Sequence, residues 1–154
     1  YLADIAKWWS SNISEDWFSL RSEVYGILQR EDTLKEIVRL LGPEALPDEE
    51  KLILEVARMV KIGLLQQNSF DDVDTFCSPE KQFKLMKLLV DFYQKGQQAI
   101  KEGTPLSDIR AMSSITSILK ARMDVKDDEM AKLDELSNKM TEEFKSITGV
   151  KVSN

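Results

Sequence analysis

Apolar residues recur at intervals of three and four over most of this sequence. In the stretch that follows Ser14, the apolar positions are Trp17, Leu20, Val24, Ile27 and Leu28. This spacing places apolar side chains on one face of an α-helix, whereas a half-buried strand needs strict alternation. No stretch of the chain shows a convincing series of alternating strands. The sequence therefore predicts an all-α fold, a helical bundle of about five to seven helices.

Glycine, proline and capping residues mark where the predicted helices begin and end. Gly42-Pro43 stops the first long pattern, in which a bend is expected near Glu31-Asp32. Asp48 is the N-cap candidate of the next helix. Ser78-Pro79-Glu80 combines a hydroxyl cap, a proline at the first helical position and an acid in the first turn. The helices predicted in this way cover residues 2–13, 14–41, 49–67, 79–102, 107–123 and 126–148.

The chain contains no histidine and a single cysteine among its 154 residues. The absence of histidine excludes Ser/His/Asp triads, Cys/His pairs and HExxH zinc sites. A lone cysteine, Cys77, excludes an internal disulfide, and we expect it to have a structural or incidental role. The net charge of −6 argues against a general nucleic-acid or anionic-membrane binder. No apolar run approaches the ~20 residues needed to span a bilayer, so we expect a soluble chain.

Motifs for phosphate or metal binding are also missing from the sequence. The six glycines frame neither GxxxxGK[ST] nor GxGxxG. Acidic clusters occur at residues 48–50, 71–74 and 127–129, but none has the EF-hand pattern. Helix capping and the helix dipole explain acids at helix starts. The sequence therefore predicts no catalytic residue and no metal site.

Two segments between the predicted helices do not have the composition of a hydrophobic core. The first, Gly42 to Glu50, is acidic and contains two prolines. Its Leu46 is an apolar residue in a polar turn, and it needs either a partner surface or a packing role inside the domain. The second is Gln66 to Phe70, followed by Phe76, where amides and aromatics could hold a flat heterocycle by stacking and edge hydrogen bonds. From composition alone, loop anchoring is favoured over ligand contact.

These two segments also carry a family resemblance. Residues 40–47 are LLGPEALP and residues 52–59 are LILEVARM; residues 65–70 are LQQNSF and residues 73–82 are VDTFCSPEKQ. In this order and spacing they resemble the LVGPDALP…LILEVARM and LQQNAF…VDTYCSPEKQ segments of a known family. That family is the carboxy-terminal helical domain of the catalytic A subunit of archaeal-type and vacuolar-type rotary ATP synthases. The resemblance covers about residues 1 to 100 and departs from the family at Ile62-Gly63-Leu64, where members commonly have an acidic pair and an aromatic.

The resemblance implies a role in nucleotide binding. Phe70 and Phe76 match the family positions that line the adenine pocket. We add Gln67 as a candidate, because an amide can hydrogen bond to the edge of a base. ATP or ADP with Mg would be the cofactor of the parent subunit, whose phosphate and Mg ligands would lie outside this chain. We expect the isolated chain to be inactive and to bind no nucleotide tightly, because it can build no phosphate contacts.

The resemblance also implies a contact with the rotor. The segment after Gly42 is similar to the acidic helix-turn-helix of rotary ATPase catalytic subunits that touches the central stalk. The residues assigned to this contact are Pro43, Glu44, Ala45, Leu46, Pro47, Asp48, Glu49 and Glu50. The implied partners are the central-stalk subunits and the non-catalytic B subunit. We expect no nucleic acid and no direct membrane contact.

The expected organisation is one helical carboxy-terminal domain over residues 1–154 of a larger subunit. The chain begins at Tyr1 rather than at a methionine, and we expect a nucleotide-binding α/β domain with a P-loop upstream of it. The parent would couple ATP synthesis or hydrolysis to proton or sodium transport, in the cytoplasm and peripheral to the membrane through the complex. The alternative is a free-standing acidic helical module that binds a basic or amphipathic partner through the Gly42 to Glu50 segment.

Overall fold

The computed structural model describes residues 14–65, 79–126 and 128–149 of the chain. Its elements are α2 (Ser14–Leu41), η1 (Pro43–Ala45), α3 (Asp48–Val60), η2 (Lys61–Leu65), α4 (Pro79–Lys101), α5 (Leu106–Arg110), α6 (Ser114–Asp124) and α7 (Ala131–Gly149). The element η1 is a short 3-10 helix, and η2 is a π-helical turn. The described ranges contain no strand, so the predicted all-α fold is confirmed.

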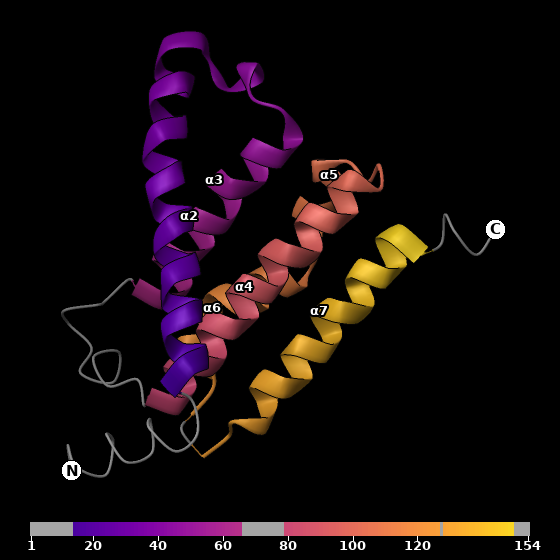
Figure 1. The fold of residues 1–154 in the computed structure, drawn as a ribbon. Coiled ribbons are helices and arrows are strands. Elements are labelled where there is room, and N and C mark those ends of the chain that lie inside the picture. The colour runs from indigo at the N-terminus through magenta and orange to yellow at the C-terminus, as the bar shows by residue number, and fades with distance from the viewer. Residues whose placement is uncertain (1–13, 66–78, 127, 150–154) are drawn as a thin grey trace.

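The helices pack around α4. This helix contacts α2, α3, α6 and α7, and Figure 1 shows it crossing the middle of the bundle. Helices α2 and α3 form an antiparallel hairpin whose closed end rises above the rest of the bundle (Figure 1). On the other side of α4, Phe92 meets Phe144 of α7 edge to face, with ring centroids 5.3 Å apart. That geometry is one that aromatic pairs prefer.

A close contact between α3 and α4 depends on a glycine. A Cβ added to Gly96 of α4 would lie 3.0 and 3.1 Å from the two Cδ atoms of Leu52, which is completely buried in α3. Glycine therefore lets the leucine side chain pack directly on the α4 backbone. Gly26 of α2 differs, because an added Cβ there would meet nothing within 4 Å.

The two short helices are capped by acids from other helices. Asp48, at the start of α3, accepts a hydrogen bond from the Leu106 amide of α5 at 3.1 Å. Glu143 of α7 accepts bonds from the amides of Ser113 and Ser114 at 3.0 and 2.8 Å, at the start of α6. The Ser113 hydroxyl donates to the same carboxylate at 2.9 Å. Helix N-termini have unpaired amides, and carboxylates satisfy them well.

The helix predictions were wrong in four places, two of which involve these caps. A single helix over residues 107–123 was predicted, but α5 ends at Arg110 and a new helix begins at Ser114. Asp48 was predicted to cap its own helix; it is instead the first residue of α3, preceded by Pro47, and it caps α5. The last helix begins at residue 131 rather than near 126, and α2 continues unbroken across the expected bend. The predicted opening helix, residues 2–13, lies outside the described residues.

The glycine at position 96 gives a first prediction. Gly26→Ala should stabilise the chain by up to ~1 kcal/mol, because alanine is the better helix former and has open space there. Gly96→Ala has the same propensity gain but crowds Leu52, and overpacking costs ~1–3 kcal/mol. Denaturant unfolding should therefore place the Gly96 variant below both the Gly26 variant and the unmodified chain. Equal stabilisation by both substitutions would show that Leu52 can move aside.

Glu143 gives a prediction for pH dependence. Burial alone would raise the pKa of Glu143, but the hydrogen bonds from Ser114 and Ser113 outweigh it and hold that pKa below its ordinary value of 4.5. A lowered folded-state pKa means that the stabilisation is complete above pH 4.5 and is lost as the pH falls through the folded-state pKa. Glu143→Ala should cost ~0.5–2 kcal/mol at neutral pH, as for the loss of an N-cap.

Unfolding curves at neutral and acidic pH test this expectation. The difference between Glu143→Ala and the unmodified chain should narrow in acid. Glu142→Ala is the matched control, because the neighbouring Glu142 is exposed and its ion pair is with Lys145, also exposed. Surface pairs of this kind contribute ~0–1 kcal/mol. A pH-independent loss for the Glu143 variant would contradict the capping role.

Candidate functional site

The tip is the closed end of the α2–α3 hairpin, residues 40–50. Gly42 has φ +87°, a conformation that side-chain-bearing residues rarely adopt, and its amide donates to the Val38 carbonyl at 2.8 Å. The chain then turns through η1, where the amides of Ala45 and Leu46 donate to the carbonyls of Gly42 and Pro43. Two prolines further restrict the turn. The tip is therefore a tightly folded turn with its own hydrogen bonds.

Leu46 packs into the domain. Only 4% of it is exposed, and it belongs to the hydrophobic core. Of the two roles that the sequence left open for this residue, the structure shows the internal one. Asp48 is likewise engaged inside the chain, through its bond to the Leu106 amide. Among the residues assigned to the rotor contact, Pro43, Glu44, Ala45, Pro47 and Glu49 are exposed.

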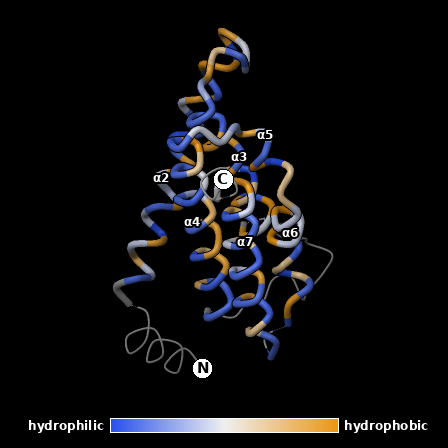
Figure 2. Tube along the Cα trace, turned by 90° about the vertical axis from the view of Figure 1, so that its right-hand side faces the viewer, coloured by the Kyte–Doolittle hydropathy of each residue, from blue (hydrophilic) through white to orange (hydrophobic). Residues whose placement is uncertain are grey.

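The exposed apolar residues of the tip are a different set from the one the sequence suggested. Leu40 and Leu41, at the end of α2, are 74% and 72% exposed. Figure 2 shows hydrophobic and hydrophilic residues side by side where this end stands clear of the bundle. Exposed leucines next to each other form an apolar patch that a partner can cover. Their adjacency alone did not signal this exposure, because neighbouring apolar residues on a helix can both be buried, as Leu52 and Ile53 are.

The candidate adenine residues, Phe70, Phe76 and Gln67, lie outside the described residues. The elements on either side of them are described. Before them, η2 takes the place of the last helical turn predicted for residues 49–67, at the position where the sequence departs from the family pattern. Lys61 of η2 bonds to Glu31 of α2 at 2.5 Å, and this bond raises the pKa of Lys61. The Glu31 side chain is 6% exposed, so α2 holds the start of the π-turn through a largely buried acid.

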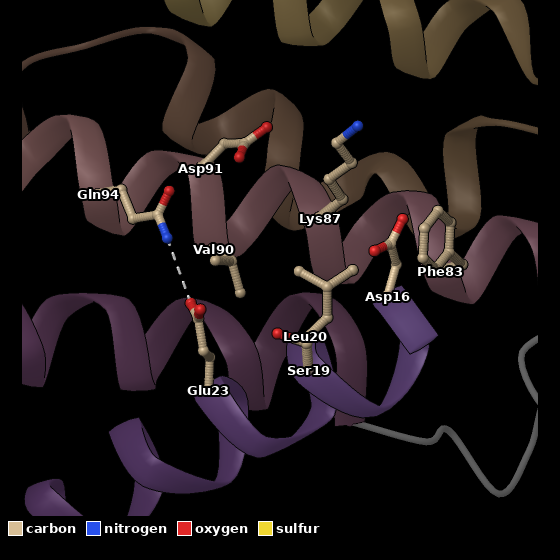
Figure 3. A pocket seen from close by; sticks show the side chains of 9 residues that line it. All are labelled: Asp16, Ser19, Leu20, Glu23, Phe83, Lys87, Val90, Asp91 and Gln94. Carbon is tan, nitrogen blue, oxygen red and sulfur yellow. Dashed lines mark hydrogen bonds between the residues drawn. The ribbon is translucent and has the colours of Figure 1, made fainter. Parts of the chain in front are cut away.

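A groove lies between α2 and α4 (Figure 3). Its volume is about 240 Å³, which is below the usual range for ligand pockets. The groove is lined by Asp16, Ser19, Leu20, Glu23, Phe83, Lys87, Val90, Asp91 and Gln94. Gln94 donates to Glu23 across it at 3.4 Å, and burial raises the pKa of Asp91 despite the nearby Lys87 and Lys95. We assign no ligand to this groove.

Neither a metal-binding cluster nor a membrane-spanning helix occurs in the described part of the chain. Within ranges 14–65, 79–126 and 128–149, no three histidine, cysteine, aspartate or glutamate residues are grouped so that they could hold a metal ion. No helix in the same ranges combines the length and the apolar character needed to cross a membrane.

Comparison with known proteins identifies the family. The sequence profile of the C-terminal domain of V and A type ATP synthase matches residues 6–110. This match covers most of an all-α chain that carries the hairpin and tip described above, so the chain belongs to that family. The resemblance seen in the sequence is thereby confirmed.

Several longer relatives are similar over nearly the whole chain. The A subunit of the A-type ATP synthase of Ignicoccus hospitalis is 43% identical over 150 residues, which are 96% of this chain and 25% of the relative. The corresponding protein of Sulfolobus acidocaldarius is 44% identical over 149 residues, which are again 96% of this chain and 25% of the relative. The V-type ATP synthase alpha chain of Halothermothrix orenii is 39% identical over 151 residues, which are 94% of this chain and 26% of the relative. The chain thus spans about a quarter of the length of these relatives.

The tip gives a prediction that distinguishes its buried leucine, which stabilises the domain, from its two exposed leucines, which do not. Leu46→Ala should destabilise the chain by ~2–5 kcal/mol, as for other buried leucines. Leu40→Ala and Leu41→Ala should each change the unfolding free energy by no more than ~0.5 kcal/mol, because both side chains are already in solvent. Chemical denaturation of the three variants measures the difference. A small effect at Leu46 would mean that its side chain is not part of the core.

Proposed function

We propose that this chain is the carboxy-terminal domain of the catalytic subunit of an A/V-type rotary ATP synthase. The observation that carries the proposal is the similarity over 96% of the chain to the A subunits of A-type ATP synthases, of which it spans 25%. The rest of such a protein would supply the P-loop, the Mg ligands and phosphoryl transfer, coupled to ion transport. The domain would then hold one side of the nucleotide's base and touch the rotor.

The nucleotide role is assigned to the segment between η2 and α4. Phe70 and Phe76 would stack on adenine, and Gln67 would bond to its edge. These three residues lie between two described elements, η2 and α4, both of which are fastened to the helical bundle. A stacking surface is useful only when it is held in one place, because a loosely held ring loses much of its contact energy to ordering entropy.

The rotor role is assigned to the tip, and the exposure of its side chains decides which residues should carry it. The contact surface would be the exposed apolar pair Leu40 and Leu41, next to the exposed acids Glu44 and Glu49. Acids steer a basic partner and set its register, while desolvated leucines supply contact area. The expected partner is therefore a basic and partly apolar surface of the central stalk. The non-catalytic B subunit would be a neighbour in the same complex.

Phe70→Ala tests the nucleotide role in the whole catalytic subunit. Loss of one stacking face should remove ~1–3 kcal/mol and weaken ATP binding about 5- to 150-fold. Phe18→Ala is the control, because Phe18 is an aromatic on α2 that is 65% exposed and far in sequence from the segment. Equilibrium binding of ATP measures both. Unchanged affinity in a folded Phe70 variant would show that the aromatic only anchors a loop.

Crosslinking in the assembled complex tests the rotor role. The background variant Cys77→Ser removes the lone native cysteine, and a new cysteine replaces Ala45 in the tip or Glu135 on the exposed side of α7. A short crosslinker at Ala45→Cys should capture a central-stalk protein in at least one rotational state, and the Glu135→Cys control should not. Capture of stator subunits alone by the tip would refute the rotor role.

A further inference from the structure

Helix α5 lies along the first two turns of α3, at the base of the tip. Asp48, the first residue of α3, accepts a hydrogen bond on Oδ2 from the Leu106 amide at the start of α5, at 3.1 Å. Further along α3, Oε2 of Glu55 lies 3.9 Å from Nε of Arg110, in the last turn of α5. Positions 48 and 55 share one face of a helix, so both acids are directed at the same short helix. Figure 1 shows α5 beside the start of α3, at the end of the bundle from which the hairpin rises.

Helix α5 is in turn part of the body of the domain. Leu106 and Ile109 are 3% and 0% exposed and belong to the hydrophobic core. The helix also contacts α7. The bond to Asp48 therefore connects the base of the tip to a helix that is itself packed in place.

The two polar links between α3 and α5 are unequal. Glu55 already bonds to Arg58 within α3 at 2.6 Å, and the Arg110 side chain is about half exposed, so the longer pair contributes little. The Asp48 carboxylate accepts from an amide at a helix N-terminus in part-buried surroundings, which makes a charge-assisted bond favoured by the helix dipole. Asp48 is therefore the stronger of these two links.

The cap of α5 comes from the tip rather than from the residue before α5. Pro105 occupies the N-cap position and provides no side-chain hydrogen bond. Asp48 satisfies the Leu106 amide instead. The acid next to it, Glu49, is exposed. Two neighbouring acids of the tip thus have different surroundings, since one binds α5 and the other faces solvent.

The tip presents its exposed leucines in one direction only if its base is fixed. Its own hydrogen bonds make the turn rigid, but a rigid turn on a loose base would move as a unit and lose contact energy to ordering. The burial of Leu46 also holds the base. Apolar packing is non-directional, however, whereas a hydrogen bond fixes an orientation.

We propose that Asp48 is a positioning residue for the rotor contact. By binding the amide of Leu106, it fixes the base of the tip to α5 and so sets the direction in which Leu40 and Leu41 are presented. The inference rests on the proposed rotor role of the tip. Asp48 itself touches no partner and acts through the exposed leucines.

The test uses Asp48→Ala in the whole catalytic subunit and in the assembled complex. Spin labels at Ala45→Cys and Glu135→Cys, with the native cysteines replaced by serine, report the distance between the tip and α7 in the subunit. Loss of the bond should broaden this distance distribution. In the membrane-reconstituted complex, ATP-driven ion transport should fall by about 2- to 30-fold relative to ATP hydrolysis, the range over which altering a network changes coupling. The affinity for Mg-ATP should not change.

Three matched variants complete the experiment. Asp48→Asn removes the charge but keeps an oxygen acceptor, so it should retain most of the coupling. Glu49→Gln removes one charge from the exposed neighbour and should leave the distance distribution unchanged. Ile118→Val controls for lost stability, because trimming a buried methyl group of α6 weakens the core without touching the tip. If Asp48→Ala does not fold, Asp48→Ser replaces it, since the shorter side chain keeps a polar group but falls short of the amide.

The outcomes separate this inference from the proposed function. If the tip crosslinks to the central stalk but Asp48→Ala changes neither the distance distribution nor the coupling, the positioning role is wrong and the rotor role stands. If no stalk protein is captured, both are wrong. A broader distribution with unchanged coupling would also overturn the inference. So would an equal loss in Asp48→Asn, which would make the charge rather than the bond responsible, or in Ile118→Val, which would report general destabilisation.

Discussion

The packing of Leu52 on the backbone of Gly96 is the contact on which the rest of this domain depends. It sets how closely α3 approaches α4, and α4 in turn contacts α2, α6 and α7. Because interiors are close-packed, a shift of a few tenths of an ångström at this contact moves the neighbours on the far side of α4 as well. The edge-to-face pair of Phe92 and Phe144, on the α7 side, is therefore positioned indirectly by a leucine of α3.

Acids that reach across the bundle then determine where the short helices begin. Helix α5 has five residues and α6 has eleven, and isolated helices of this length are marginal in water. Asp48 and Glu143 satisfy amides at their N-termini from α3 and α7. The short helices thus depend on helices that are distant in the sequence, since Asp48 and Leu106 are 58 positions apart.

This dependence also explains what could be predicted from the sequence. The period of apolar residues is local information, so α2 and α4 were predicted with nearly correct bounds. The break between α5 and α6 is stabilised by Glu143, which lies outside residues 107–123, and within that range the signal was the pair Ser113-Ser114, a residue type that favours N-caps. The burial of Leu46 likewise depends on how the tip folds back on the domain, whereas the sequence around it allowed either a partner surface or a packing role inside the domain. The adenine candidates came from the family resemblance, because composition favoured a loop anchor.

Helix α3 joins the two regions to which function is assigned. It begins at Asp48 in the tip and continues directly into η2, whose Leu64 carbonyl is bound by Arg122. Many of its side chains between these ends are buried, so bending it would open the core. At the tip end, the burial of Leu46 and the bond from the Leu106 amide to Asp48 fasten the turn to the body of the domain. Under the proposed function, a push by the rotor on Leu40 and Leu41 would therefore act on a turn that is fastened to packed helices rather than on a loose loop.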